Sequence, residues 1–370
     1  MLESTTWVGM DVHQEQIVVA MLRGWNRKPQ EFQVPHTASG VKKLVKRLKE
    51  FGQLESAYEA GPCGFDLQRR LRAEGIACAV IAPSLTPIKP GERIKTDRRD
   101  ARKLAEQLRA RQLTEVHAPS QAQEAVRDLC RCREDAREDL MRARHRLSKM
   151  LLRRGRVYRA GNNWTHKHRR WLLALEWGQE ADRVVFGDYL QAVELLEERM
   201  KGLDAALEHA AAQEPYRQPV GWLKCFRGFN TVNAMTVVAE LFEIARFSSP
   251  RQLMSYLGLV PSERSSGGSR WQGGITKSGN RHVRRVMVNA AWHYRHRPAV
   301  GAALRKRREG QPAAIVSLAD RAQHRLHRRF MRLLLGRGKC SQKAVVAVAR
   351  ELTGFIWAAL ALYPEQLNHQ

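Results

Sequence analysis

Short apolar runs alternate with amphipathic stretches over the first hundred residues. Two apolar runs, 7–12 and 17–22, are separated by a few polar residues, which is the pattern of a β-hairpin. The segments that follow predict, in order, a helix, a strand, a helix and a strand, at 41–51, 57–60, 65–73 and 76–81. This order predicts a mixed α/β sheet.

Helical periodicity dominates after residue 95. One helix is predicted to run through Leu104 and Leu108, and a longer one spans 121–152, where apolar residues recur every three or four positions. Farther on, apolar residues follow alternating steps of three and four over nearly three heptads: Val193, Leu196, Met200, Leu203, Leu207 and Ala210. This seam predicts either a helical hairpin within one chain or a coiled coil between copies, and the pattern leaves both open.

The last third combines helices with one long irregular segment. Helices are expected around 237–241 and 250–257 and within 296–362, and the segment 258–280, rich in Gly, Ser and cations, is expected to be a loop. Long ordered loops are often functional, although a flexible connector is the alternative. We therefore expect three parts: an α/β domain over 1–152, a helical coiled-coil region over 153–215, and a mainly helical domain over 216–370.

The charge of the chain points to a polyanionic partner. Lys and Arg number 64 against 37 Asp and Glu, a formal net charge of +27, while 43% of residues are hydrophobic, as in a folded protein. No apolar stretch of about 18 residues and no signal-peptide pattern is apparent, so no membrane partner is expected. Six scattered cysteines without a CxxC pair fit a reducing compartment.

Four acidic residues stand out in the α/β part. Asp11 and Glu59 each interrupt a predicted strand, and Asp97 and Asp100 open a predicted helix. Taken singly, they fit ordinary roles: Asp97 at or near a helix N-cap with Asp100 three residues later, Asp11 at a bulge or strand end, and Glu59 in an ion pair. As a set within one small unit they supply the hard oxygen ligands that Mg²⁺ prefers.

The motifs around these acids resemble one family. Asp11 in GMDVH, Glu59 in AYEAGPCG, and Asp97 and Asp100 in KTDRRDARKLAE look like the Asp-Glu-Asp-Asp set of the RuvC-like domain in bridge RNA-guided insertion-sequence transposases. The segment from Gly258 is similar to that family's transposase domain. Its matching elements are Gly258 to Pro261, Ser266-Gly267, Ile275 to Gly279, and Arg281, Arg284 and Arg285.

The resemblance implies a fold and a chemistry. It implies a RuvC-like domain of the ribonuclease H fold, Mg²⁺ held by the four acids, and a nucleophilic serine at Ser266, with Ser265 as the adjacent rival. The cations expected to contact nucleic acid are Arg264, Arg270, Lys277, Arg281, Arg284 and Arg285. It further implies a DNA recombinase guided by a structured bridge RNA, acting on element ends and target DNA as a homo-oligomer in the bacterial cytoplasm, at the nucleoid.

Two other functions remain open on the residues alone. A metal-dependent, junction-resolving nuclease would need the acids but not Ser266, and a non-catalytic nucleic-acid-binding scaffold would need only the basic surface. Nucleotide-hydrolase, zinc-protease and α/β-hydrolase chemistry are disfavoured, because the P-loop, HExxH and GxSxG motifs are missing from the sequence.

Overall fold

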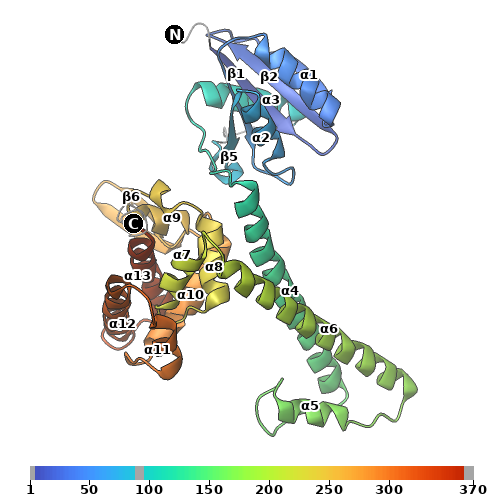
Figure 1. Cartoon of the computed structure of the whole chain (residues 1–370), viewed down its shortest axis with the longest axis vertical. Coiled ribbons are helices and arrows are strands. Elements are labelled where there is room, and N and C mark those ends of the chain that lie inside the picture. Colours follow the sequence, from blue (N-terminus) through green and yellow to red (C-terminus); the bar gives the residue numbers. More distant parts are fainter. Residues whose placement is uncertain (1–4, 88–95, 362–370) are drawn as a thin grey trace. The chain divides into compact units, whose positions relative to one another are not determined.

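The computed structural model describes residues 5–87 and 96–361, except the side chain of Arg270. The chain divides into two compact units, residues 1–119 and 120–370, which are described separately (Figure 1). The sequence predicts a first domain boundary after residue 152. The boundary between the compact units lies earlier, after residue 119, because the long helix α4 (Gln121–Arg153) packs against α6 (Glu180–Ala211) and α8 (Thr231–Leu241).

The first unit contains a five-stranded mixed sheet with strand order β3-β2-β1-β4-β5. Its strands are β1 (Thr6–Val12), β2 (Gln16–Arg23), β3 (Gln30–Pro35), β4 (Leu54–Glu59) and β5 (Ala77–Ile81). The predicted β1–β2 hairpin is confirmed, and β1–β4 and β4–β5 pair in parallel. Sequence reading missed β3, an edge strand whose polar, largely uncovered side chains give no apolar run.

Helices cover both faces of this sheet. α1 (Ala38–Lys49) and α2 (Asp66–Ala73) bury apolar side chains against one face, together with Val8 and Met10 of β1. α3 (Asp97–Arg109) covers the other face. Side chains alternate along a strand, so Trp7, Gly9 and Asp11 of β1 face α3.

Gly9 lets α3 lie unusually close to β1. A Cβ atom at residue 9 would lie 2.1 Å from the carbonyl oxygen of Ala101 and 2.4 Å from the amide nitrogen of Ala105. Ala101 and Ala105 are themselves fully buried. These small residues therefore allow the first turn of α3, which carries Asp97 and Asp100, to approach the end of β1 that carries Asp11.

The second unit begins with a pair of long helices, α4 and α6, joined through α5 (His166–Leu173). Apolar side chains of α4 and α6 share a hydrophobic cluster, in which Val193 is buried and Leu196 and Met200 are partly buried. The heptad seam thus packs within the chain, in keeping with the helical-hairpin alternative. Near α5, His168 is buried and packs against the rings of Tyr158, Trp164 and Trp171.

The rest of the second unit is a helical domain with its own core. Its helices are α7 (Arg217–Lys224), α8, α9 (Pro250–Tyr256), α10 (Arg281–Ala291), α11 (Ala302–Arg308), α12 (Ala313–Leu334) and α13 (Ser341–Ala361). Short 3-10 helices lie at Pro83–Leu85 in the first unit and at Ile244–Arg246 and Trp292–Arg295 in the second. The helices predicted over the last third of the sequence are confirmed.

The segment expected to be a long loop is mostly a β-hairpin. β6 (Pro261–Ser266) pairs with β7 (Ser269–Ile275) in antiparallel fashion, and Gly267 and Gly268 form the two-residue turn. Gly267 has a φ of +58°, which glycine adopts without steric cost. The prediction of a loop was wrong because these exposed strands carry Ser, Gly and charged residues in place of an apolar alternation.

α13 is long and apolar enough to span a membrane by length and composition. Its residues Val345, Val348, Leu352 and Ile356 are buried in the core of the second unit, against other helices of that domain. The apolar composition of α13 is therefore explained by its place in the core of this domain.

Candidate metal site and serine hairpin

The carboxyl ends of β1 and β4 bring two of the predicted acids to one edge of the sheet. Met10 pairs with Tyr58 in the parallel register, so the next residues, Asp11 and Glu59, lie at the carboxyl ends of neighbouring strands, Asp11 one residue before the end of β1. Met10 and Tyr58 face α1 and α2, and successive side chains of a strand point to opposite faces. Asp11 and Glu59 therefore face the side of the sheet that α3 covers. The register places Asp11 and Glu59 on the same edge and the same face.

α3 supplies the other two acids from its first turn. Thr96 is the N-cap, and its hydroxyl accepts a hydrogen bond from the amide of Arg99. Asp97 is the first helical residue, next to the N-cap, and Asp100 lies three residues later in the same first turn. Because Thr96 meets the capping requirement, the Asp97 carboxylate is left to point at other groups.

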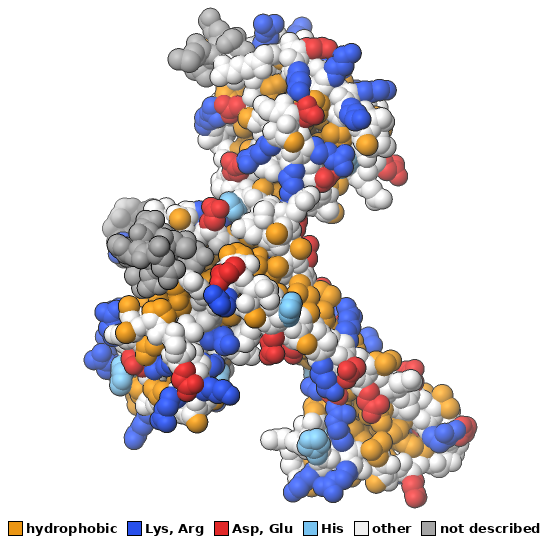
Figure 2. Space-filling view, in the orientation of Figure 1, with side chains coloured by type: hydrophobic (Ala, Val, Ile, Leu, Met, Phe, Trp, Pro, Cys, Tyr) orange, Lys and Arg blue, Asp and Glu red, His pale blue; other side chains and the backbone are white. Residues whose placement is uncertain are grey.

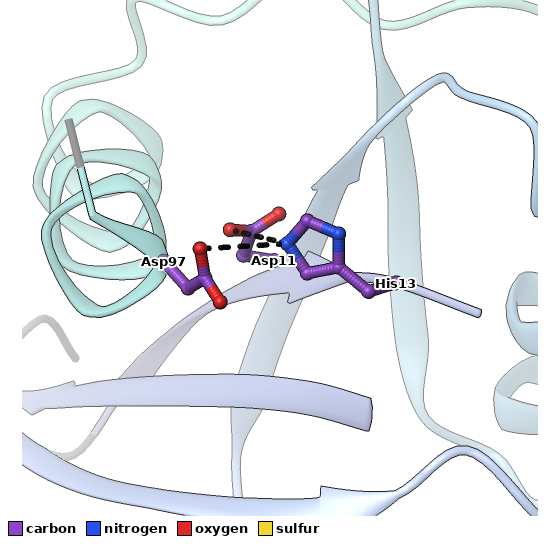
Figure 3. Close-up of side chains that lie close together, drawn as sticks. All are labelled: Asp11, His13 and Asp97. Atoms are coloured by element: carbon purple, nitrogen blue, oxygen red, sulfur yellow. Dashed lines mark hydrogen bonds and ion pairs between the residues drawn. The ribbon is translucent and has the colours of Figure 1, made fainter. Parts of the chain in front are cut away.

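Asp11, Asp97 and His13 form a compact group, hereafter the Asp11 cluster (Figure 3). Nε2 of His13 lies 3.1 Å from Oδ2 of Asp11 and 3.7 Å from Oδ1 of Asp97. Nε2 of Gln16 donates a hydrogen bond to the second oxygen of Asp97, at 3.3 Å. The fold thus joins residues separated by more than eighty positions in sequence.

The Asp11 cluster accumulates negative charge. Partial burial raises the pKa of Asp11; His13 acts to lower that pKa, and the charges of Asp97 and Asp100 raise it further. Asp100 is therefore close enough to act on Asp11 electrostatically. Glu59 is exposed at its strand end, and its carboxylate is not one of the three groups of the cluster.

The predicted serines lie at the tip of the β6–β7 hairpin, hereafter the serine hairpin. Ser266 pairs with Ser269 across the turn, and Ser265 pairs with Arg270. Both serines are exposed. The hydroxyl of Ser265 donates a 2.9 Å hydrogen bond to Oε1 of Glu263, so the carboxylate nearest to these serines in sequence is engaged by Ser265.

Backbone hydrogen bonds, hereafter the clamp, join the two ends of the serine hairpin at its base. The amide of Lys277 donates to the carbonyl of Gly258, and the amide of Asn280 donates to that of Tyr256. A Cβ at Gly279 would lie 1.9 Å from the carbonyl oxygen of Tyr256, and one at Gly258 would lie 2.3 Å from that of Ser278. The glycines flanking the hairpin therefore permit close contact between its two ends.

Comparison with known proteins finds family matches over the two regions that hold the four acids and the serine hairpin. The transposase family IS116/IS110/IS902 matches residues 222–305, and the transposase domain of the IS110 DEDD type matches residues 8–154. The y4qE protein of Sinorhizobium fredii, described by its name as a transposase, is 38% identical over 355 residues, 95% of this chain and 87% of that protein. The transposase for insertion sequence element IS1533 of Leptospira borgpetersenii is 35% identical over 344 residues, 90% of this chain and 97% of that protein.

The chain belongs to the IS116/IS110/IS902 family of transposases. As an insertion-sequence transposase it acts on DNA. A transposase domain of the DEDD type indicates use of a divalent metal, and the Asp11 cluster is a candidate place for one.

The cations predicted to contact nucleic acid in this transposase divide into two groups. Arg284 donates hydrogen bonds to the carbonyls of Leu257 and Ser278, and Arg285 forms a 2.7 Å ion pair with Glu134. These two guanidinium groups have partners within the folded unit. Three others are exposed to solvent: Arg264, Lys277 and Arg281. The side chain of Arg270 lies outside the described part of the chain.

A further set of exposed cations lies in the C-terminal helices of the transposase. Figure 2 shows Lys and Arg side chains gathered over α11 and α12. Within these two helices the exposed cations include Arg305, Lys306, Arg321, Arg325 and Arg328. They extend the basic surface of the second unit beyond the serine hairpin and α10.

Sequence reasoning missed His13 and Glu240 as site residues. His13 was treated as part of a polar turn, although its position two residues after Asp11 puts both side chains on one side of the backbone. Glu240 lies within an apolar helix, where a buried acid signals a specific partner. It is 2% exposed and contacts Arg131 and Asn280.

Proposed function

We propose that this transposase cuts and exchanges DNA strands between its element and a target, guided by a structured bridge RNA. The chemistry is assigned to a metal site formed by Asp11, Glu59, Asp97 and Asp100 and to the nucleophile Ser266. The observation that carries the proposal is the convergence of Asp11 and the first turn of α3 at one edge of the sheet. A five-stranded sheet in the order β3-β2-β1-β4-β5 is consistent with a ribonuclease H fold.

The residues present fit a divalent cation. The candidate ligands are hard carboxylate oxygens, and the raised pKa of Asp11 reflects, after its burial, the negative charges of Asp97 and Asp100. A divalent cation would relieve this repulsion. When bound, such a cation would offset the negative charge that builds on a scissile phosphate.

Ser266 is assigned the covalent step. Its Oγ forms a bond to phosphorus while the bond from phosphorus to the leaving strand's oxygen breaks, and the serine proton passes to an acceptor. Attack by the hydroxyl of a new strand reverses these changes and releases the serine. The phosphoserine bond conserves the energy of the phosphodiester, so rejoining needs no external energy source. Ser265 remains the rival, because its hydroxyl already contacts Glu263.

The proposed partners follow from the net charge of the chain and from the placement of the acids and the serine in different units. A net charge of +27 supports binding of both DNA and a structured RNA. The proposed acids and serine lie in different units, and we assign them to a composite site built from two protomers of an oligomer. Action in the bacterial cytoplasm, at the nucleoid, is part of the same proposal.

Trapping the reaction on a suicide DNA substrate tests the covalent step. We expect a protein–DNA adduct with the wild type and with Ser265→Ala, and none with Ser266→Ala. Loss of the adduct only in Ser265→Ala would move the nucleophile by one residue. Cleavage without an adduct in all three would favour the junction-resolving nuclease, and binding without cleavage would favour a scaffold.

Omitting the RNA tests guidance separately. Strand exchange on matched DNA should require the RNA transcribed beside the reading frame, and changing the RNA's pairing segment should redirect the target. Full exchange by the purified protein without RNA would contradict the guided part of the proposal and leave the metal and serine assignments intact.

A further inference from the structure

His13 lies where a metal ligand would lie. Two ligands that bind one ion at about 2.1 Å are at most about 4.2 Å apart. Nε2 of His13 is 3.1 Å from an oxygen of Asp11 and 3.7 Å from an oxygen of Asp97, so both histidine distances fall below this limit. In Figure 3 the ring presents Nε2 toward both carboxylates.

Local structure holds the histidine in this place. The amide of His13 donates a 2.9 Å hydrogen bond to the carbonyl of Gln16 and so closes the tight turn between β1 and β2. The carbonyl of His13 lies 2.7 Å from Nδ1 of His36. Gln16, on the other side of the same turn, binds Asp97. The turn therefore positions both His13 and one of the acids that face it.

We propose that His13 is a nitrogen ligand of the metal site and that it shifts the site's preference from Mg²⁺ toward Mn²⁺. The proposal rests on the metal site of the proposed function and adds a residue outside its four carboxylates. Mg²⁺ prefers oxygen ligands and retains its water, whereas imidazole raises affinity for transition metals. A site with carboxylates and one imidazole differs in this respect from a site of carboxylates alone.

The competing explanation is an ion pair. A protonated His13 would neutralise Asp11 and give the same 3.1 Å distance without binding any metal. The two explanations differ in what removal of the ring does. Loss of a ligand weakens metal binding selectively for metals that bind nitrogen, whereas loss of a positive charge beside two carboxylates strengthens the binding of every divalent cation.

Metal binding by the full chain tests the proposal without a measurement of catalysis. The dissociation constant for Mn²⁺ is measured from the electron paramagnetic resonance signal of free Mn²⁺, and that for Mg²⁺ by competition. We expect His13→Ala to weaken Mn²⁺ binding about tenfold and Mg²⁺ binding less than threefold. His13→Asn, which offers an oxygen in place of nitrogen, should lower the preference for Mn²⁺ to the same extent.

A direct signature accompanies these constants. Electron spin echo measurements on the Mn²⁺ complex should show coupling to a ligand nitrogen in the wild type and in His145→Ala, an exposed control on α4, but not in His13→Asn. The melting temperature of each variant, measured without metal, separates a loss of fold from a loss of ligand.

The outcomes distinguish this proposal from the proposed function. Unchanged or tighter Mn²⁺ binding in both His13 variants, with binding lost in Asp11→Asn, would assign His13 to an ion pair and keep the metal site. Equal binding by the wild type and Asp11→Asn would remove the metal site, and the proposal with it. Nitrogen coupling that persists in His13→Asn would also overturn the proposal.

Discussion

The side-chain amide of Asn280 donates a 2.7 Å hydrogen bond to the buried carboxylate of Glu240. Asn280 is the N-cap of α10 and the last residue of the clamp at the base of the serine hairpin. The same carboxylate accepts two hydrogen bonds from Arg131 on α4, at 2.7 Å and 3.0 Å. Glu240 therefore ties the base of the hairpin to the long helix that begins the second unit.

Removing this carboxylate should destabilise the second unit. We expect Glu240→Ala to lower the free energy of unfolding by about 3 kcal/mol, because it leaves Arg131 and Asn280 without their shared partner. Chemical denaturation of the full chain measures the change. Glu243→Ala, at an exposed position nearby, is the control and should stay within about 0.5 kcal/mol of the wild type. Equal stability of the two variants would contradict the role given to Glu240.

The stability that Glu240 contributes should depend on pH. Burial acts to raise its pKa, but hydrogen bonds and charge from Arg131, with help from Asn280, hold the pKa below its ordinary value of 4.5. A group with a lowered folded-state pKa contributes its full stability above its unfolded-state pKa and loses it as the pH falls through the folded-state pKa. The advantage of the wild type over Glu240→Gln should therefore be complete at pH 7 and shrink below about pH 4.5. A constant difference down to pH 3 would count against this coupling.

Gly9 should matter for the metal site as well as for the fold. In Gly9→Ala the new methyl group would overlap the backbone of α3 at Ala101, and we expect α3 to shift and stability to fall by about 2 kcal/mol. Because Asp97 lies on the first turn of α3, Mn²⁺ affinity should fall too. Gly61→Ala, where the nearest atom would be 3.9 Å away, is the matched control in the same unit. Unchanged Mn²⁺ affinity in a folded Gly9→Ala protein would show that the close packing of α3 on β1 is not required for the metal site.

Much of the first unit follows from its hydrophobic pattern, and its exceptions have local causes. The β1–β2 hairpin, β4, β5 and the helices between them were predictable because each buries an apolar face. β3 and the serine hairpin were not, because edge and exposed strands are held by backbone hydrogen bonds and do not require an apolar side chain at alternate positions. Apolar periodicity indicates an element that buries one face. It gives no signal for a strand that lies at the surface.

The candidate site was only partly predictable for a related reason. Asp11 and Asp97 attract notice as members of a set of four acids within one small unit, which supplies the hard oxygen ligands that Mg²⁺ prefers. Their contact with His13 depends on the register of β1 and on the small residues that admit α3, which no single motif encodes. Likewise, Arg284 and Arg285 look like phosphate ligands in sequence, and only packing shows that carbonyls and Glu134 engage them.

This difference among the arginines of α10 gives a further prediction. Arg281→Ala should weaken DNA binding and reduce the slope of binding against salt by about one counterion, because its side chain is exposed. Arg284→Ala should mainly lower the melting temperature, because it removes hydrogen bonds to two backbone carbonyls. DNA titrations at several salt concentrations and thermal unfolding distinguish the two. The reverse pattern would place Arg284 on the nucleic acid.

α6 offers a matched pair of leucines that tests how the copies associate. Leu207 is fully buried in the core of the second unit, whereas Leu195 is 65% exposed on the same helix. We expect Leu207→Glu to unfold this unit, because a charge cannot be buried there without a partner. Leu195→Glu should keep the melting temperature and, if α6 carries the interface of the proposed oligomer, shift sedimentation toward the monomer and reduce strand exchange in parallel. Unchanged sedimentation of Leu195→Glu would move the interface away from this face of α6, because an apolar side chain in a protein interface does not tolerate a charge.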